Sequence, residues 1–181
     1  YYSFLAADRL GAPYAIASSP LTIPATELEA LLTRSPGLQR AQELYILGRE
    51  PDAETEWRQA TRAFDRPALR QAARLAQRWD WHGQAIATIA RAEHWDDLEL
   101  RFPLAWREGV VNQAHAGALD PAWVYAVIRQ ESGFRPAARS PVGALGLMQI
   151  MPATGRQIAR ELQDAAATDP PLLQPETNIR Y

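Results

Sequence analysis

The chain has 181 residues, which is enough for one or two domains with a sizeable hydrophobic core. Its net charge of −2 and its lack of a basic stripe argue against nucleic acid as a partner, and no apolar run is long enough to serve as a transmembrane segment. Because the sequence contains no cysteine, disulfides, thiolate catalysis and cysteine-based metal sites are excluded.

The first hundred residues have the pattern of short amphipathic helices separated by proline and glycine. We expect helices over residues 1–10, 26–32, 38–47, 51–64, 67–79 and 82–92. Helices joined by short connections and rich in alanine predict an α-solenoid or superhelical array over residues 1–103. The tryptophans in this region are interpreted as helix-packing residues; they are Trp57, Trp79, Trp81 and Trp95.

A boundary is expected near residues 101–104, and the helical pattern then resumes. Further helices are predicted over residues 105–116, 121–131 and 153–162. No long segment alternates between apolar and polar residues with a period of two, so we expect an all-α chain. The second predicted domain covers residues 104–181.

The helix at residues 121–131 is well bounded in sequence. Asp120 followed by Pro121 is a favourable N-cap and first-turn pair, and Gly133 is a favourable residue just beyond the C-terminus. Glu131 is therefore expected in the last turn of this helix.

Glu131 also occupies a position where an apolar side chain is expected. Val124, Val127 and Ile128 fall at i, i+3 and i+4, and Glu131 is the i+7 residue that should continue the apolar stripe. A carboxylic acid shielded from water keeps its proton more readily, as a general acid must. The alternative is a solvated glutamate that pairs with Arg135 at i+4.

Two short blocks, the first of which begins at the last residue of this helix, suggest a family. They read Glu131-Ser132-Gly133-Phe134 and Gly146-Leu147-Met148-Gln149, and residues 175–181 are similar to the start of a third block. With these motifs the chain resembles the soluble lytic transglycosylases, in which a superhelical array precedes a lysozyme-like catalytic domain. The resemblance implies an all-α protein whose lysozyme-like domain carries a small β element near residues 140–146.

The same resemblance implies a reaction. The substrate would be the glycan strand of peptidoglycan, cut at the β-1,4 bond between N-acetylmuramic acid and N-acetylglucosamine. Glu131 would act first as acid and then as base, so that the muramic 6-hydroxyl attacks C1 and leaves a 1,6-anhydro end. No cofactor is implied, and the expected location is the periplasm or cell envelope of a bacterium.

The resemblance assigns substrate contacts to further residues, each of which has a simpler structural role as an alternative. The candidates are Ser132, Ser140, Met148, Gln149 and Met151. Ser132 is equally consistent with a local bond at the helix end, Ser140 with a turn, and the two methionines with core packing. Gln149 is the best candidate, because an amide set among apolar residues needs hydrogen-bond partners.

Some alternatives remain open at this point. A muramidase would cut the same bond with water, and a helical scaffold could bind glycan strands without turnover. The three histidines, His82, His94 and His115, are scattered and define no metal site. The Ala-Tyr-Asn-Ala-Gly-type block of the family is absent, because the chain stops at Tyr181; we therefore expect an incomplete catalytic domain with weak or no activity by itself.

Overall fold

The computed structural model describes residues 2–14 and 16–181, and all regular secondary structure within these ranges is helical. The prediction of an all-α chain is confirmed. The first helices are α1 Tyr2–Leu10, α2 Ala25–Thr33, α3 Pro36–Ile46, α4 Glu50–Ala60, α5 Arg66–Arg78 and α6 His82–Arg91. They are followed by α7 Leu98–Arg101, α8 Arg107–Ala116, α9 Pro121–Glu131, α10 Pro152–Glu161 and α11 Pro175–Arg180. Tyr1, which the sequence assigned to the first helix, lies outside the described residues.

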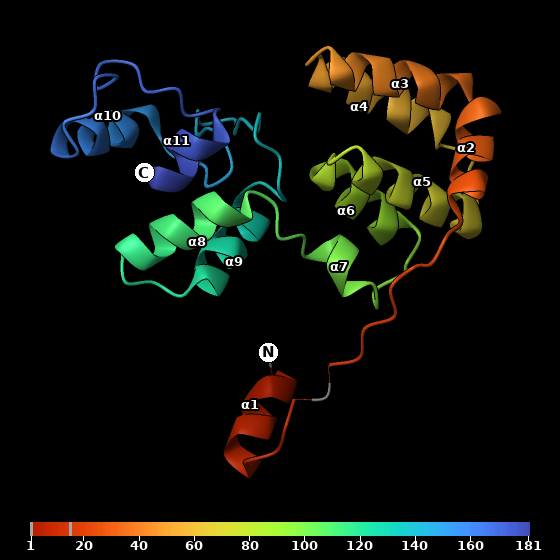
Figure 1. Ribbon diagram of the computed structural model, residues 1–181, viewed down its shortest axis with the longest axis horizontal. Coiled ribbons are helices and arrows are strands. Elements are labelled where there is room, and N and C mark those ends of the chain that lie inside the picture. Colours follow the sequence, from red (N-terminus) through yellow and green to blue (C-terminus); the bar gives the residue numbers. More distant parts are fainter. Residues whose placement is uncertain (1, 15) are drawn as a thin grey trace.

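Helices α2 to α6 form an array in which α3 packs on α4, α5 packs on α6, and α2 contacts both α3 and α5 (Figure 1). The aromatic centre of this array is built from tryptophans. Trp57 and Trp81 are fully buried and meet edge to face at 5.5 Å, and Trp79 contacts Trp57 in the same way at 5.8 Å. The indole nitrogen of Trp57 donates a hydrogen bond to the Thr88 hydroxyl at 3.0 Å, which satisfies it inside the core. For these three tryptophans the packing prediction is confirmed.

Trp95 departs from that prediction. Its side chain is 51% exposed, and the Arg101 guanidinium lies 5.2 Å from the centre of the ring. It lies between the end of α6 and the start of α7, and the arginine over its face belongs to α7. An exposed ring with a cation over its face is a stable surface arrangement, and it needs no helix packing.

Two further details of the array differ from the sequence-based expectation. Helix α4 ends at Ala60 and does not reach residue 64. The short helix α7 was not predicted; it begins after Asp97, whose buried carboxylate accepts hydrogen bonds from the main-chain nitrogens of Leu100 and Leu21, both at 2.9 Å. A four-residue helix leaves no periodic pattern in the sequence, because it is held by its cap and by a contact with residues 76 positions earlier.

Helices α8, α9 and α11 and the segment between α9 and α10 form a second hydrophobic cluster. Its buried members are Ile86, Val110, Ala114, Val124, Ile128, Phe134, Leu147 and Ile179. All except Ile86 follow residue 104, whereas the cluster of the array ends at Leu100. These two cores support our proposal that the chain divides into residues 1–103 and 104–181. Ile86 of α6 is the member of the second core that comes from the first part.

The segment between α9 and α10 carries a small β element. Arg139 pairs with Leu145, and Leu145 pairs with Ile150, as isolated antiparallel bridges. The small β element expected near residues 140–146 is therefore present. Helix α1 stands apart from the other helices (Figure 1), and none of its residues is buried. Among the described residues, the helices are too short or too polar for any of them to cross a bilayer.

Candidate active site

Helix α9 places Glu131 at its C-terminal end. The Asp120 carboxylate caps the other end by accepting a hydrogen bond from the Ala122 nitrogen at 2.8 Å, and Pro121 occupies the first turn. Beyond Glu131 the chain turns sharply, since Gly133 and Phe134 have φ angles of 60° and 65°. The helix boundaries agree with those derived from the sequence.

The buried face of α9 is not the one that the sequence suggested. Val124 and Ile128 are buried, and the row continues at i+8 with Ser132, which is 2% exposed. Glu131 is exposed, and Val127 is only half-buried. The expectation that Glu131 lies on the buried face is therefore wrong. Around the helix axis Glu131 lies about 60° from Ile128 and about 100° from Ser132, so it is off the row that stays buried at this end of the helix.

The carboxylate of Glu131 is unengaged. Within residues 2–14 and 16–181 it has no hydrogen-bond or ion-pair partner. The ion pair with Arg135 that offered a simple structural role is not formed, because the Arg135 Nε donates to the Ser132 carbonyl oxygen at 3.0 Å. Glu131 is thus a free acid at a helix end, available to an incoming ligand.

The two predicted substrate-contacting serines already have partners in the protein. The Ser132 hydroxyl donates to the Ile128 carbonyl at 3.1 Å, inside the last turn of α9. The Ser140 hydroxyl accepts from the Ala144 nitrogen at 2.9 Å and closes a turn that Gly143 completes with a φ of 93°. Both side chains have the local structural role given as the alternative; their contact with substrate stays a prediction.

The Gln149 side chain forms hydrogen bonds within the segment between α9 and α10. The Gln149 side-chain nitrogen donates to the carbonyl oxygens of Gly146 at 2.8 Å and Ala138 at 3.3 Å. Among the residues described, its side-chain oxygen has no partner, so one end of the amide is left for a ligand. Met148 is half-buried against the second core, whereas Met151 is 41% exposed at the start of α10.

Sequence reasoning missed Asn178, although it lies in the third block. Its side chain is completely buried and forms hydrogen bonds to the main chain of Met148, Leu145 and Leu172 at 2.7, 3.0 and 2.7 Å. The available signal was an asparagine beside the apolar Ile179 within a helical pattern, since a buried amide must find partners elsewhere in the fold.

Two of the four carboxylates that follow α9 have hydrogen-bond partners in the protein. Glu161, the last residue of α10, accepts a hydrogen bond from Gln157 at 3.0 Å. Asp164 accepts from the Ala166 nitrogen, the Tyr181 hydroxyl and Arg180, and these interactions lower its pKa, the backbone hydrogen bond most strongly. Among the described residues no cluster of acidic and histidine side chains forms a metal site.

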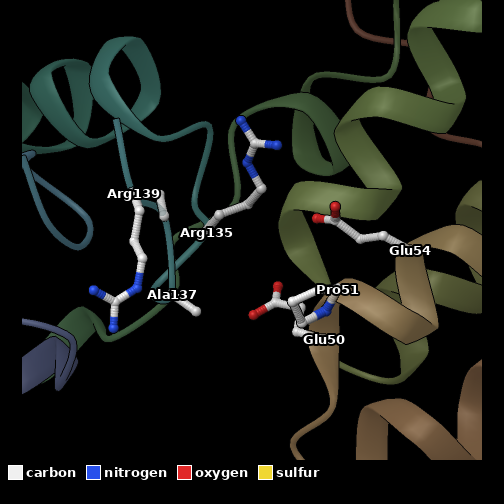
Figure 2. A pocket seen from close by; sticks show the side chains of 7 residues that line it. Glu50, Pro51, Glu54, Arg135, Ala137 and Arg139 are labelled. Carbon is white, nitrogen blue, oxygen red and sulfur yellow. The ribbon is translucent and has the colours of Figure 1, made fainter. Parts of the chain in front are cut away.

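A charged cavity lies where the array meets the segment after α9. It has a volume of about 210 Å³, and Figure 2 shows the carboxylates of Glu50 and Glu54 on α4 facing the strand-like segment that carries Arg135 and Arg139. Burial raises the pKa of Glu50, whose carboxylate also accepts a hydrogen bond from the Trp81 indole at 3.3 Å. Glu131 does not line this cavity.

Comparison with known proteins agrees with this architecture. The family described as "Soluble lytic murein transglycosylase L domain" matches residues 31–98, and "Transglycosylase SLT domain" matches residues 110–181. The soluble lytic murein transglycosylase of Salmonella typhimurium is 33% identical over 180 residues, which are 99% of this chain and 27% of that protein.

Two solved structures have the same fold. An inactive glutamate-to-glutamine mutant of the lytic transglycosylase Slt from Pseudomonas aeruginosa superposes with a TM-score of 0.88 at 41% identity, covering 99% of this chain and 29% of that one. The 70-kDa soluble lytic transglycosylase of Escherichia coli gives a TM-score of 0.89 at 31% identity, with the same coverage. The chain thus spans about a quarter of the length of these relatives. With a helical array followed by a lysozyme-like transglycosylase domain, it belongs to the soluble lytic transglycosylase family.

Proposed function

We propose that the protein cleaves the glycan strands of peptidoglycan without water, at the β-1,4 bond between N-acetylmuramic acid and N-acetylglucosamine. Membership of the family supports this substrate, because the relatives are named murein transglycosylases. The relatives are bacterial proteins described as soluble, which supports action in the periplasm or cell envelope.

Glu131 is the proposed acid and base. The observation that carries this role is an exposed carboxylate at the end of α9, without a protein partner among the described residues and directly before the Ser-Gly-Phe turn. Replacement of a glutamate by glutamine in the Pseudomonas aeruginosa relative is described as giving an inactive protein, which is consistent with an essential glutamate.

In the proposed reaction the Glu131 carboxylic acid donates its proton to the glycosidic oxygen as the bond from C1 to that oxygen breaks. The acetamido group of the substrate stabilises the positive charge at C1. The Glu131 carboxylate then removes the proton of the muramic 6-hydroxyl, and the oxygen bonds to C1. The proton returns to Glu131, so the net change is a rearrangement into a 1,6-anhydro end and a free 4-hydroxyl.

A single carboxylate suffices for this sequence of steps, whereas hydrolysis by paired carboxylates requires a second one nearby. Glu161 and Asp164 bind protein groups on or after α10. The attacking hydroxyl belongs to the substrate and is already close to C1, which favours it over water. Because Glu131 is exposed in the free protein, we propose that the bound glycan strand itself shields this carboxylate from water.

The segment at residues 138–151 forms the proposed wall of the glycan groove. Its candidates for sugar contact are the free oxygen of Gln149 and the exposed Met151. Met148, Ser132 and Ser140 complete the proposed set and act more through the shape of the site, since the Met148 nitrogen and the two hydroxyl groups already have partners in the protein.

The decisive experiment is the Glu131→Gln substitution in the full-length protein, assayed on purified sacculi by mass spectrometry of the released products. We expect release of anhydro-muropeptides to fall by at least a thousandfold, because the amide can neither donate nor accept the required proton. Glu161→Gln is the matched control, since Glu161 is also an exposed last residue of a helix, and it should retain normal activity. Substantial release by Glu131→Gln would refute the assignment.

The same assay separates the alternatives. A muramidase would leave a reducing muramic end, whereas the proposed reaction leaves the anhydro end. A glycan-binding scaffold would retain strands without releasing products. Reducing ends as the main product, or binding without release by the unmodified protein, would contradict the proposed function.

A further inference from the structure

We propose that Asn178 is a positioning residue, which holds the block at residues 145–149 in the shape needed to bind the glycan strand. This inference rests on the proposed function, because it concerns the wall of the same groove. Asn178 itself touches no substrate in this proposal; it acts through the main chain of the block that carries Met148 and Gln149.

The Asn178 side chain forms hydrogen bonds to the main chain of Leu145, Met148 and Leu172, and we call this arrangement the clamp. The side-chain oxygen accepts a hydrogen bond from the Met148 nitrogen at 2.7 Å. The side-chain nitrogen donates to the carbonyl oxygens of Leu145 at 3.0 Å and Leu172 at 2.7 Å. One fully buried amide therefore joins both ends of the Leu145–Met148 turn to the segment before α11. Its oxygen and both amide hydrogens are used, so rotation or displacement would leave buried polar groups unsatisfied.

Gly146 fits against this clamp. It has a φ of 77°, and a Cβ atom placed on it would collide with the Leu172 carbonyl oxygen and the Asn178 side chain. The backbone of the glycine is thus pressed directly on the amide. Only a residue without a side chain allows this approach, which explains why glycine begins the Gly-Leu-Met-Gln block.

The clamp reaches the predicted sugar contacts through short covalent and hydrogen-bonded paths. Gln149 directly follows Met148, has a φ of 53°, and its side-chain nitrogen donates to the Gly146 carbonyl. The orientation of the free Gln149 oxygen therefore depends on the main chain of Gly146 and Met148. Asn178 holds this main chain in place. Because a misplacement of about 1 Å can cost a hundredfold in rate, loss of the clamp should reduce binding and catalysis without removing any reacting group.

The test is Asn178→Asp in the full-length protein. The aspartate keeps an acceptor for the Met148 nitrogen, but it places an oxygen against the carbonyl groups of Leu145 and Leu172. Asn178→Ser is the second variant, because it removes the hydrogen bonds without adding charge. Val110→Ala is the control for stability; Val110 is fully buried in the same core but lies on α8, outside residues 145–149.

Two readouts are measured at a temperature at which all variants are folded: affinity for soluble glycan strands, and kcat/KM for anhydro-product release. We expect both Asn178 variants to lose at least tenfold in each, whereas Val110→Ala lowers only the Tm. Wild-type affinity and kcat/KM in the folded Asn178 variants would overturn the proposal and leave Asn178 a purely structural residue. Absence of anhydro product with the wild type would instead refute the proposed function, and the affinity comparison would still test Asn178.

Discussion

At the scale of single residues, Glu131 shows what a helical pattern can and cannot determine. The sequence placed it correctly in the last turn of α9, because the Asp120 cap and Gly133 define the ends. Its exposure was predicted wrongly, because the buried row rotates from Val124 through Ile128 towards Ser132 along the helix, and the neighbouring elements decide which residue of the last turn is covered. Ser132 is covered instead. The identity of the candidate acid could thus be predicted, but its environment could not.

His82 gives a prediction at the same scale. Its ring contacts Trp106, its Nδ1 is buried without a partner in the described structure, and burial lowers its pKa. The folded protein therefore binds this proton less readily than the unfolded chain. The contribution of neutral His82 to stability is complete above the unfolded pKa of about 6.5 and decreases as the pH falls below it.

The measurement is the free energy of unfolding between pH 7.5 and pH 5 for the wild type and for His82→Gln, which cannot titrate. We expect the wild type to lose more stability on acidification, with a difference in slope of at most about 1.4 kcal/mol per pH unit. Parallel curves for the two proteins would show that His82 has the same pKa in the folded protein and in the unfolded chain.

At the scale of elements, the bounds of the predicted helices lie within two residues of those in the described structure, except at the end of α4. Asp65 and Asp120 both cap as their residue types suggest, each accepting a hydrogen bond from a first-turn nitrogen. Helix α4 was predicted too long, because Thr61 and Phe64 continue its buried face after the helix has ended. Periodicity reports which face is covered, whereas the end of a helix without a glycine or proline depends on tertiary contacts.

The cap of α9 can be tested directly. Asp120→Ala removes the acceptor for the Ala122 nitrogen and should destabilise the protein by about 1 kcal/mol. Asp120→Ser retains a capping oxygen and should remain within a few tenths of a kcal/mol of the wild type. Chemical denaturation followed by circular dichroism measures both. Equal stability of the alanine and serine variants would mean that the cap contributes nothing.

At the scale of the whole molecule, the sequence predicted two helical parts but not how they meet. One contact between them is made by Gly83 at the start of α6 and by the turn after α9. A Cβ atom on Gly83 would collide with the side chain of Arg135 and lie 3.2 Å from the Gly133 carbonyl oxygen. Neither residue has a sequence signal for this role, because a contact between residues about 50 positions apart leaves no local periodic pattern.

This junction provides a double-mutant test of whether the array supports the end of α9. Gly83→Ala should destabilise the protein by about 1–3 kcal/mol, because the added methyl group overfills the contact. In an Arg135→Ala background the same substitution should cost much less, since the side chain that it strikes is gone. Gly109→Ala is the control: nothing lies within 4 Å of its added Cβ, so helix propensity alone should make it neutral or slightly stabilising.

The contact between Gly83 and Arg135 should also affect the candidate site. Arg135 is anchored on the Ser132 carbonyl at 3.0 Å, one residue after Glu131, so a methyl group on Gly83 pushes on the turn that positions the proposed acid. Gly83→Ala should therefore lower kcat for anhydro-product release in the full-length protein more than it raises KM, although Gly83 lies on the array. Additive destabilisation in the double mutant, with unchanged kcat, would mean that the array and the catalytic helix touch at this point without influencing each other.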